Sequence, residues 1–228
     1  MKISIVIASF GHAQYLEKAI DSAITQTVPC EVIVVDDGSV DGSLEIAKGY
    51  EVAGIKLIRQ VNKGLASARN AGIMNATGDY ILPLDADDML KSNCAEKILE
   101  VAAKTNADVI APSIHCFGLG EHTTILTENP TIEDFKQGNR LAYCSAIKRS
   151  VLLEVGGYSP RMDTLGGWED LHLWYDLLTR GKKFVTIQEP LVYYRTKAES
   201  MWTRAEENKE KLWDQLIKDF PHIAHHRR

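Results

Sequence analysis

The sequence Asp79-Tyr-Ile-Leu-Pro-Leu-Asp-Ala-Asp-Asp88 is the most informative segment of this chain. Its apolar residues 80–84 predict a buried strand, and three carboxylates follow within four residues. Burying such a cluster without partners would be costly, so it must meet water, a cation or a donor-rich ligand. Because alternate residues of an extended chain point the same way, we expect Asp85 and Asp87 on one side. Oxygen ligands of this kind suit Mg²⁺ or Mn²⁺ carrying phosphates, so the segment predicts a metal–diphosphate site.

Length and composition indicate an ordinary globular protein. The chain has 228 residues, 45% hydrophobic and 25% charged, which is enough for one large domain or a domain with an appendage. A net charge of -5 argues against general nucleic-acid binding. The four cysteines have neither CxxC pairs nor zinc-ligand spacing, as expected for reduced thiols of a cytosolic protein.

We also expect a cytoplasmic, soluble protein, because the sequence shows neither a secretory leader nor a membrane-spanning segment. The opening residues 1–7 are too short and too poor in cleavage signals to be a secretory leader. No apolar segment approaches the roughly 20 residues that span a bilayer.

Predicted strands and helices alternate through the first half. Apolar runs predict strands over 3–8, 32–35, 56–59, 80–84 and 109–111, and helical spacing predicts helices over 13–26, 41–50, 64–75 and 95–104, the second capped by Asp41. Repeated strand–helix units imply an α/β fold with a mainly parallel sheet and right-handed crossovers. In such sheets ligands bind beyond the carboxyl ends of the strands.

Polar and aromatic residues follow three of these strands. Ser9 and Phe10 end the first, Asp36 and Asp37 end the second, and Asp85 ends the fourth. The ring could stack on a base while the carboxylates bond its N–H groups or ribose hydroxyls. The dinucleotide fingerprint GxGxxG and the phosphate loop GxxxxGK[ST] are both absent, which favours a nucleotide site built on carboxylates and a metal. The alternative role of Asp36 and Asp37 is to form a turn before Gly38.

The second half is less regular. We expect a hairpin or loop over 115–126, a strand over 141–147 and a short helix over 150–155. Gly166-Gly167-Trp168-Glu169-Asp170 then leads into a helix over 171–179. Acidic residues in a first helical turn are favoured by the helix dipole, so Glu169 and Asp170 could be helix starters. A carboxylate on such a glycine-preceded turn is equally placed to act as a general base.

Five motifs in this order resemble the family 2 glycosyltransferases of the GT-A fold, inverting enzymes that use nucleotide sugars. They are Ile5-Val6-Ile7-Ala8-Ser9-Phe10, Val34-Val35-Asp36-Asp37-Gly38-Ser39, Ala68-Arg69-Asn70-Ala71-Gly72, Asp85-Ala86-Asp87-Asp88, and Gly156-Gly157-Tyr158 followed by Glu169-Asp170. The resemblance implies a Rossmann-like, mainly parallel mixed sheet flanked by helices, with a C-terminal helical extension. It also implies a domain over 1–202, with a nucleotide-sugar half (1–112) and an acceptor half (113–202), before a helix and basic tail (203–228).

The resemblance assigns roles on the donor side. Phe10 would stack on the base, with Ser9 and Asp37 bonding the nucleoside and Asp36 beside them. Arg69 would approach the donor phosphates or order the carboxylates, and a plain helix-surface arginine is the alternative.

The remaining roles concern the metal and the acceptor. Asp87, with Asp85, would hold the Mn²⁺ or Mg²⁺ that bridges both phosphates, and Asp85 would also hold the ribose or a metal-bound water. Asp170 would deprotonate the acceptor hydroxyl, while Glu169 orients the acceptor.

Lys197 is a departure from the family. Members commonly carry a histidine there that completes the metal site, and a lysine ammonium would repel a metal unless neutralised. Lys197 could instead contact the diphosphate as a point charge, which would make metal dependence weak or partial. A surface lysine is the alternative.

The family implies a nucleotide-sugar donor, UDP-sugar favoured, and a glycan, lipid-linked or protein acceptor. Two other functions stay open: a sugar-phosphate nucleotidylyltransferase, and a catalytically silent nucleotide-sugar-binding protein. We expect a helix over 203–220 that docks through Leu212, Trp213, Leu216 and Ile217. The ending 222–228, with Trp202 and Trp213, could meet an anionic membrane surface, but a solvated basic end is favoured. No oligomeric state is predicted.

Overall fold

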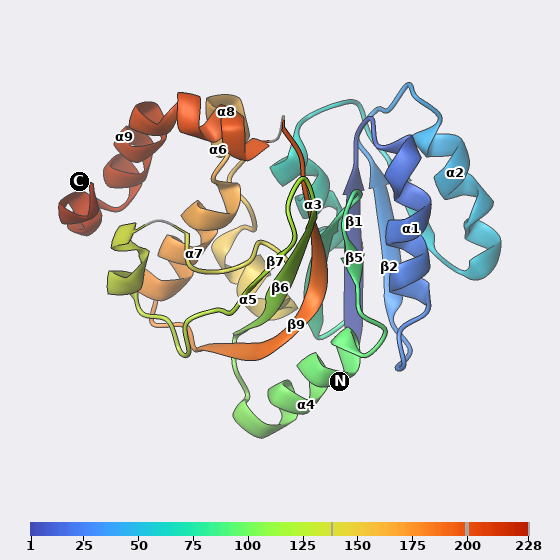
Figure 1. Ribbon diagram of the computed structural model, residues 1–228, viewed down its shortest axis with the longest axis horizontal. Helices are drawn as coiled ribbons and strands as arrows, with labels where there is room; N and C mark the ends of the chain where they lie inside the picture. Colours follow the sequence, from blue (N-terminus) through green and yellow to red (C-terminus); the bar gives the residue numbers. More distant parts are fainter. Residues whose placement is uncertain (138, 199–200, 228) are drawn as a thin grey trace.

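The computed structural model describes residues 1–137, 139–198 and 201–227 (Figure 1). The strands are β1 (Ile3–Ser9), β2 (Glu31–Asp36), β3 (Lys56–Arg59), β4 (Tyr80–Asp85), β5 (Met89–Leu90), β6 (Val109–Gly118), β7 (His122–Thr124), β8 (Ala146–Lys148) and β9 (Phe184–Thr196). The α-helices are α1 (Ala13–Ile24), α2 (Ser43–Gly49), α3 (Leu65–Asn75), α4 (Cys94–Thr105), α5 (Arg149–Val155), α6 (Pro160–Leu165), α7 (Glu169–Thr179), α8 (Met201–Glu207) and α9 (Lys209–Asp219). Three 3₁₀ turns join them: η1 (Glu51–Ala53), η2 (Ile132–Gln137) and η3 (Pro221–His226).

These strands form a mixed sheet in the order β3-β2-β1-β4-β8-β6-β9-β5, with β7 paired to β6. The first four are parallel, and β8 runs antiparallel to both of its neighbours. Pro83 is tolerated inside β4 because β8 pairs only with Tyr80 and Ile81, so no ladder bond is lost at the proline. The predicted α/β fold with a mixed sheet is confirmed.

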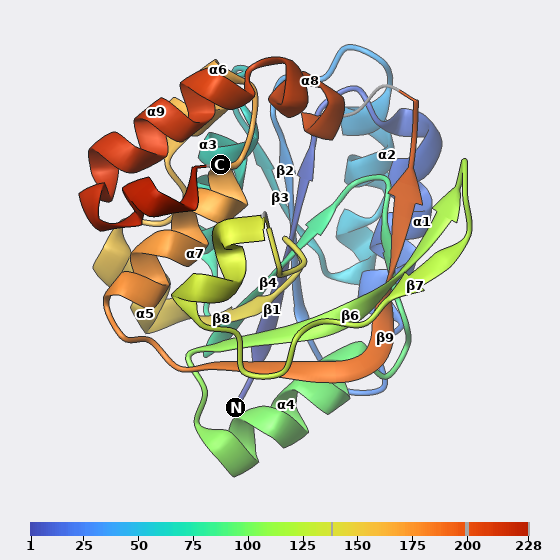
Figure 2. The same ribbon diagram turned by 60° about the vertical axis from the view of Figure 1, so that its left-hand side comes forward.

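Helices cover both faces of the sheet (Figures 1 and 2). Along β1 the side chains alternate, with Ile3, Ile5 and Ile7 in the core beneath α1 and α4, and Val6 and Ala8 in the core beneath α3. The second core continues through α5 and α7 to α9. At Gly72 of α3 an added Cβ would lie 2.2 Å from Val6, so glycine lets this helix approach the sheet closely.

Most predicted elements of the first half are present, with two differences. The helix after β2 begins at Ser43 with Gly42 as its N-cap, so the prediction of Asp41 as the cap was wrong. The Asp41 carboxylate accepts hydrogen bonds from the backbone N–H of Ala13 and the hydroxyl of Ser43, tying the start of α1 to α2. The strand predicted over 109–111 extends to Gly118 and forms the predicted hairpin with β7.

In the second half the strand predicted over 141–147 was largely wrong, because only Ala146–Lys148 pairs in the sheet. The backbone turns just before β8, where the N–H of Ser145 donates to the carbonyl of Tyr143. The side chain of Tyr143 then bonds Asp88 instead of lying in a ladder. The structure adds α6 and β9, which were not predicted.

The C-terminal extension packs on the domain. The helix predicted over 203–220 is broken at Asn208 into α8 and α9. Leu212, Trp213 and Leu216 are buried as predicted. The basic end is solvated at His222, His225 and Arg227, as predicted, but Ile223 and His226 are buried.

The packing of the C-terminal extension also bears on the predicted contact of Trp202 and Trp213 with a membrane surface. Trp213 is 7% exposed and meets Trp168 edge to face, so it is not free to contact a membrane. The Trp202 side chain and Arg228 lie outside the described residues. Within the described chain, no helix has the length and apolarity needed to cross a bilayer.

Candidate functional site

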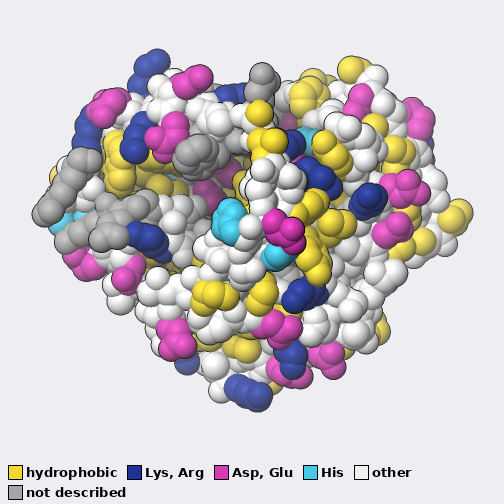
Figure 3. Space-filling model, in the orientation of Figure 1, with side chains coloured by type: hydrophobic (Ala, Val, Ile, Leu, Met, Phe, Trp, Pro, Cys, Tyr) yellow, Lys and Arg dark blue, Asp and Glu magenta, His cyan; other side chains and the backbone are white. Residues whose placement is uncertain are grey.

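The carboxyl ends of β1, β2 and β4 meet at one edge of the sheet, as predicted. Ser9 pairs with Asp36 across β1 and β2, and Ala8 pairs with Asp85 across β1 and β4. Two cavities, of about 490 and 510 Å³, open at this edge and share lining residues that include Asp85. Figure 3 shows a hollow on this face with acidic side chains inside it. The strand-end edge is therefore a two-part site.

The cavity of about 490 Å³, hereafter the donor cavity, gathers six of the predicted donor and metal residues: Ser9, Phe10, Asp37, Asp85, Asp87 and Lys197. Phe10 is 49% exposed, so its ring is available to stack on a flat ligand. The buried hydroxyl of Ser9 has no hydrogen-bond partner, which leaves it able to bond one.

The carboxylates of Asp36 and Asp37 bond different parts of the chain. Asp37 accepts hydrogen bonds from the backbone N–H of Lys63 and of Gly64, both at 2.9 Å, and from the amide of Gln60 at 2.7 Å. Asp36 is buried outside both cavities and accepts from the N–H of Ser39. The turn-forming interpretation therefore describes Asp36, while Asp37 fixes the loop before α3 and also reaches the cavity.

Lys197 is not a free surface lysine. Its ammonium forms an ion pair with Asp87, lies 3.5 Å from Nε2 of His12 and lies 5.5 Å from the ring centroid of Tyr15. Asp87 offers hard oxygen ligands on the cavity wall, where substrate phosphates could complete the coordination of Mg²⁺ or Mn²⁺. The residues thus fit a divalent cation, provided that the cation displaces the Lys197 ammonium from Asp87.

Arg69 is a buried cation at the centre of the site and not a helix-surface residue. Its guanidinium lies 2.7 Å from Asp85 and 2.7 Å from Glu169, between the rings of Tyr143 and Tyr158. These carboxylates raise the pKa of Arg69 above its usual value although burial opposes them. The arginine thereby orders the two carboxylates, one of the two roles expected for it, and lines the other cavity.

Asp88, which also lines the donor cavity, is the centre of a second network. Its burial strongly raises its pKa, and it accepts hydrogen bonds from the hydroxyl of Tyr143 at 2.6 Å and the N–H of Arg195 at 2.7 Å. The N–H of Asp85 in turn donates to the Tyr143 hydroxyl. This network holds β4 and β9 together where the donor cavity begins.

The cavity of about 510 Å³, hereafter the acceptor cavity, is lined by Asp85, Glu169 and Asp170 among others. Asp170 accepts a 2.7 Å hydrogen bond from the side-chain amide of Asn139. Burial, followed by the charge of Glu169, raises the pKa of Asp170 to about 7. A carboxyl with this pKa is suited to proton transfer near neutral pH.

The backbone before α7 aims these carboxylates. Gly166 and Gly167 have φ angles of 106° and 141°, which favour glycine, and Trp168 adopts a left-handed φ of 65°. Glu169 and Asp170 do start the helix, as the dipole interpretation expected. They also line the acceptor cavity, which is where a general base would have to lie.

Sequence reasoning missed several residues of the site. Asp163, on the unpredicted α6, accepts a hydrogen bond from the backbone N–H of Ala66 at 2.7 Å, and burial raises its pKa to about 6. Asn139 lies in a segment with no helix or strand pattern, and Tyr143 lies in the segment wrongly predicted to be a strand. Only their side-chain chemistry, an amide and a phenol near carboxylates, could have suggested them.

Sequence comparison identifies a family model and relatives that match this chain. The family model described as Glycosyl transferase family 2 matches residues 4–160. The chain is 34% identical over 215 residues to the uncharacterized glycosyltransferase alr2836 of Nostoc sp., covering 86% of this chain and 65% of the relative. It is 36% identical over 121 residues to the cholesterol galactosyltransferase of Borreliella burgdorferi, covering 52% of this chain and 34% of the relative.

Two solved structures share the fold. TarS 1-349 of S. aureus in complex with UDP has a TM-score of 0.78 at 18% identity, covering 95% of this chain and 64% of that chain. The mannosyltransferase PcManGT of Pyrobaculum calidifontis, in complex with GDP-Man and Mn2+, has a TM-score of 0.72 at 17% identity, covering 95% of this chain and 64% of that one. The chain thus spans less than two thirds of each. Together with the family match, they show that the chain belongs to glycosyl transferase family 2 and has the GT-A fold.

Proposed function

We propose that this protein is an inverting glycosyltransferase that moves a sugar from a nucleotide-diphosphate sugar to an acceptor hydroxyl. One observation carries the proposal: two cavities meet at Asp85, with an exposed aromatic ring and carboxylates in one and a carboxyl with a raised pKa in the other. Such an arrangement can hold a donor and an acceptor on opposite sides of one reacting carbon.

The donor cavity supports nucleotide binding. Phe10 stacks on the base, while Ser9 and Asp37 bond the nucleoside. Asp36, at the end of β2, supports them by holding the turn at Ser39. We favour a uridine diphosphate sugar. The UDP complex of TarS is compatible with that choice, and the GDP-Man complex of PcManGT makes guanosine the main competitor.

The reaction needs one proton transfer and one displacement. The acceptor oxygen attacks the anomeric carbon from the face opposite the leaving group, forming the new glycosidic bond and breaking the bond to the diphosphate oxygen. Asp170 takes the hydroxyl proton, Glu169 orients the acceptor, and the bond electrons leave with the nucleoside diphosphate. Asn139 holds Asp170 in position, and Arg69 keeps Asp85 and Glu169 fixed on either side of it.

Mn²⁺ or Mg²⁺ would be held by Asp87, with Asp85 close by. When bound, such a cation stabilises the negative charge that grows on the diphosphate. Lys197 already places a positive charge against Asp87. We therefore propose that Lys197 shares this task and that activity depends only partly on metal.

We also propose how the chain is divided and what kind of acceptor it uses. Residues 1–112 form the nucleotide-sugar half, 113–202 the acceptor half and 203–228 the C-terminal extension. The acceptor is a glycan, a lipid-linked glycan or a protein, handled in the cytoplasm or beside a membrane. Metal, base and acceptor assignments all depend on the same two cavities.

A panel of nucleotide sugars tests the proposal. Thermal stabilisation by UDP, GDP and TDP, with and without Mn²⁺, would identify the base and the role of the cation. Acceptor-dependent release of nucleoside diphosphate is expected from the transferase. A nucleotidylyltransferase would instead release pyrophosphate, and a silent binding protein would be stabilised by nucleotide without releasing product.

A further inference from the structure

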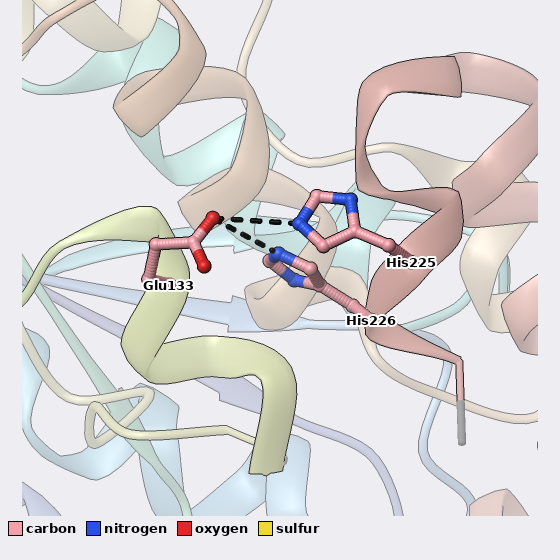
Figure 4. A group of neighbouring side chains, drawn as sticks. All are labelled: Glu133, His225 and His226. Carbon is pink, nitrogen blue, oxygen red and sulfur yellow. Dashed lines mark hydrogen bonds and ion pairs between the residues drawn. The ribbon is translucent and has the colours of Figure 1, made fainter.

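Two adjacent histidines near the end of the chain converge on a glutamate from a distant segment. His225 and His226 lie in η3, and Glu133 lies in η2. Oε1 of Glu133 is 3.4 Å from Nε2 of His225 and 3.7 Å from Nε2 of His226. Figure 4 shows both imidazoles directed at this one carboxylate oxygen. Among the described residues, these side chains form the one group of three or more potential ligands whose donor atoms all lie within 4.8 Å of one another.

Tyr175 orients the ring of His226. The Tyr175 hydroxyl lies 3.4 Å from the carbonyl oxygen of Phe135 and 3.0 Å from Nδ1 of His226. The other ring nitrogen, Nε2, faces Glu133. A hydrogen bond at one ring nitrogen that fixes the orientation of the other is the usual environment of a metal-binding histidine.

Three potential ligand atoms from two distant segments thus converge on one point at the surface. We propose that they bind a divalent transition metal, Zn²⁺ first among them, through Glu133, His225 and His226. Two imidazoles and one carboxylate are a donor set that zinc uses in proteins. This site is distinct from the Asp87 site, whose oxygen ligands suit Mg²⁺ or Mn²⁺.

The spacing of the ligands fits a tetrahedral ion. With bonds of about 2.0–2.2 Å, the edges of a tetrahedral zinc site are about 3.3–3.6 Å long. The two measured distances to Glu133 lie at or near this range. The side chains of Glu133 and His225 are 56% and 55% exposed, so solvent can reach the site and supply a fourth ligand. His226 is 1% exposed and anchors the site in the fold.

A metal here would hold the C-terminal extension on the acceptor half. It would join η3 to η2, beside α7, which carries Asp170 at its start. The chain continues from η2 to Asn139, the hydrogen-bond donor to Asp170. We therefore assign the site a structural role near the acceptor cavity, independent of donor binding.

Zinc binding to the full chain tests this proposal without any assay of activity. Equilibrium dialysis with metal analysis should find one Zn²⁺ per chain, and Co²⁺ should give the visible absorption of a tetrahedral complex. Glu133→Gln and His225→Ala, both at exposed positions, should weaken zinc binding at least about tenfold, since even groups that only support a ligand cost that much when removed.

The control separates a built site from a histidine-rich tail. His222 lies in the same η3 turn but bonds Thr179, so His222→Ala should leave zinc affinity unchanged. Wild-type affinity in Glu133→Gln would show that the tail histidines bind metal without the glutamate and would overturn the proposal. The absence of bound zinc in the unaltered chain would overturn it as well.

Discussion

The guanidinium of Arg69 lies 2.7 Å from the carboxylate of Asp85, the residue that lines both the donor and the acceptor cavity. Its other terminal nitrogen lies 2.7 Å from Glu169 on α7, 100 residues away in sequence. A single buried cation therefore fixes the strand end of the donor side relative to the helix start of the acceptor side.

Replacing Arg69 should cost stability. Arg69→Met leaves the carboxylates of Asp85 and Glu169 facing each other without a cation, so we expect a loss of about 3–5 kcal/mol in unfolding free energy. Arg69→Lys keeps the charge but lacks the planar guanidinium that reaches both carboxylates, so its loss of unfolding free energy should be smaller than that of Arg69→Met. Urea unfolding measures both. A loss below about 1 kcal/mol for Arg69→Met would contradict the role given to this cation.

The acceptor-dependent rate should depend on the ionisation of Asp170. A base works only when deprotonated, so the rate should rise as pH increases through about 7, the raised pKa of Asp170. Asn139 donates to this carboxylate and so lowers the pKa. Asn139→Ala should therefore move the acid limb of the profile to higher pH.

The pH profile has a matched control. The side chain of Asn75 bonds only the carbonyl of Ala71 in its own helix among the contacts the structure describes, so Asn75→Ala should leave the acid limb in place. An unshifted profile in Asn139→Ala would show that Asp170 is not the titrating base.

Lys197 should determine how strongly the enzyme needs metal. With Lys197 paired to Asp87, we expect the unaltered protein to keep part of its activity in a chelator. Lys197→Ala frees Asp87 to bind a cation and removes the point charge, so its activity should become strictly dependent on Mn²⁺ or Mg²⁺. Activity in chelator, measured for both proteins, checks this. Equal residual fractions would mean that Lys197 does not replace the metal.

Phe10 should contribute to affinity and not to stability. Its ring is 49% exposed, so Phe10→Ala should leave the melting temperature nearly unchanged. Loss of base stacking should weaken binding of the nucleoside diphosphate about tenfold, within the range for base–aromatic contacts. Calorimetric titration measures the affinity. Unchanged affinity would place the base elsewhere in the cavity.

Local patterns in the sequence predicted the donor edge well. Apolar runs such as 3–8 and 32–35 specify buried strands by themselves, and parallel strands bring their carboxyl ends together. Ser9, Asp36 and Asp85 therefore lie at neighbouring strand ends, as the sequence indicated.

The rest of the site depends on contacts that no local pattern encodes. The pairing of Arg69 with Glu169 spans 100 residues. Tyr143 lies in an apolar segment that resembles a strand, but its hydroxyl is drawn to Asp88 and the backbone turns away from the sheet. The tail was expected in solvent because it is basic, and its exposed residues agree, but the burial of Ile223 and His226 against the domain has no local signal in the sequence.

The most direct test of the central claim is acceptor-dependent release of nucleoside diphosphate by the unaltered protein and by Asp170→Asn. The asparagine keeps the shape of the side chain but cannot take a proton, so we expect transfer to fall by about 10²–10⁴-fold while nucleotide still raises the melting temperature equally. Full transfer activity in Asp170→Asn would contradict the assignment of Asp170 as the base and, with it, the mechanism proposed for the two cavities.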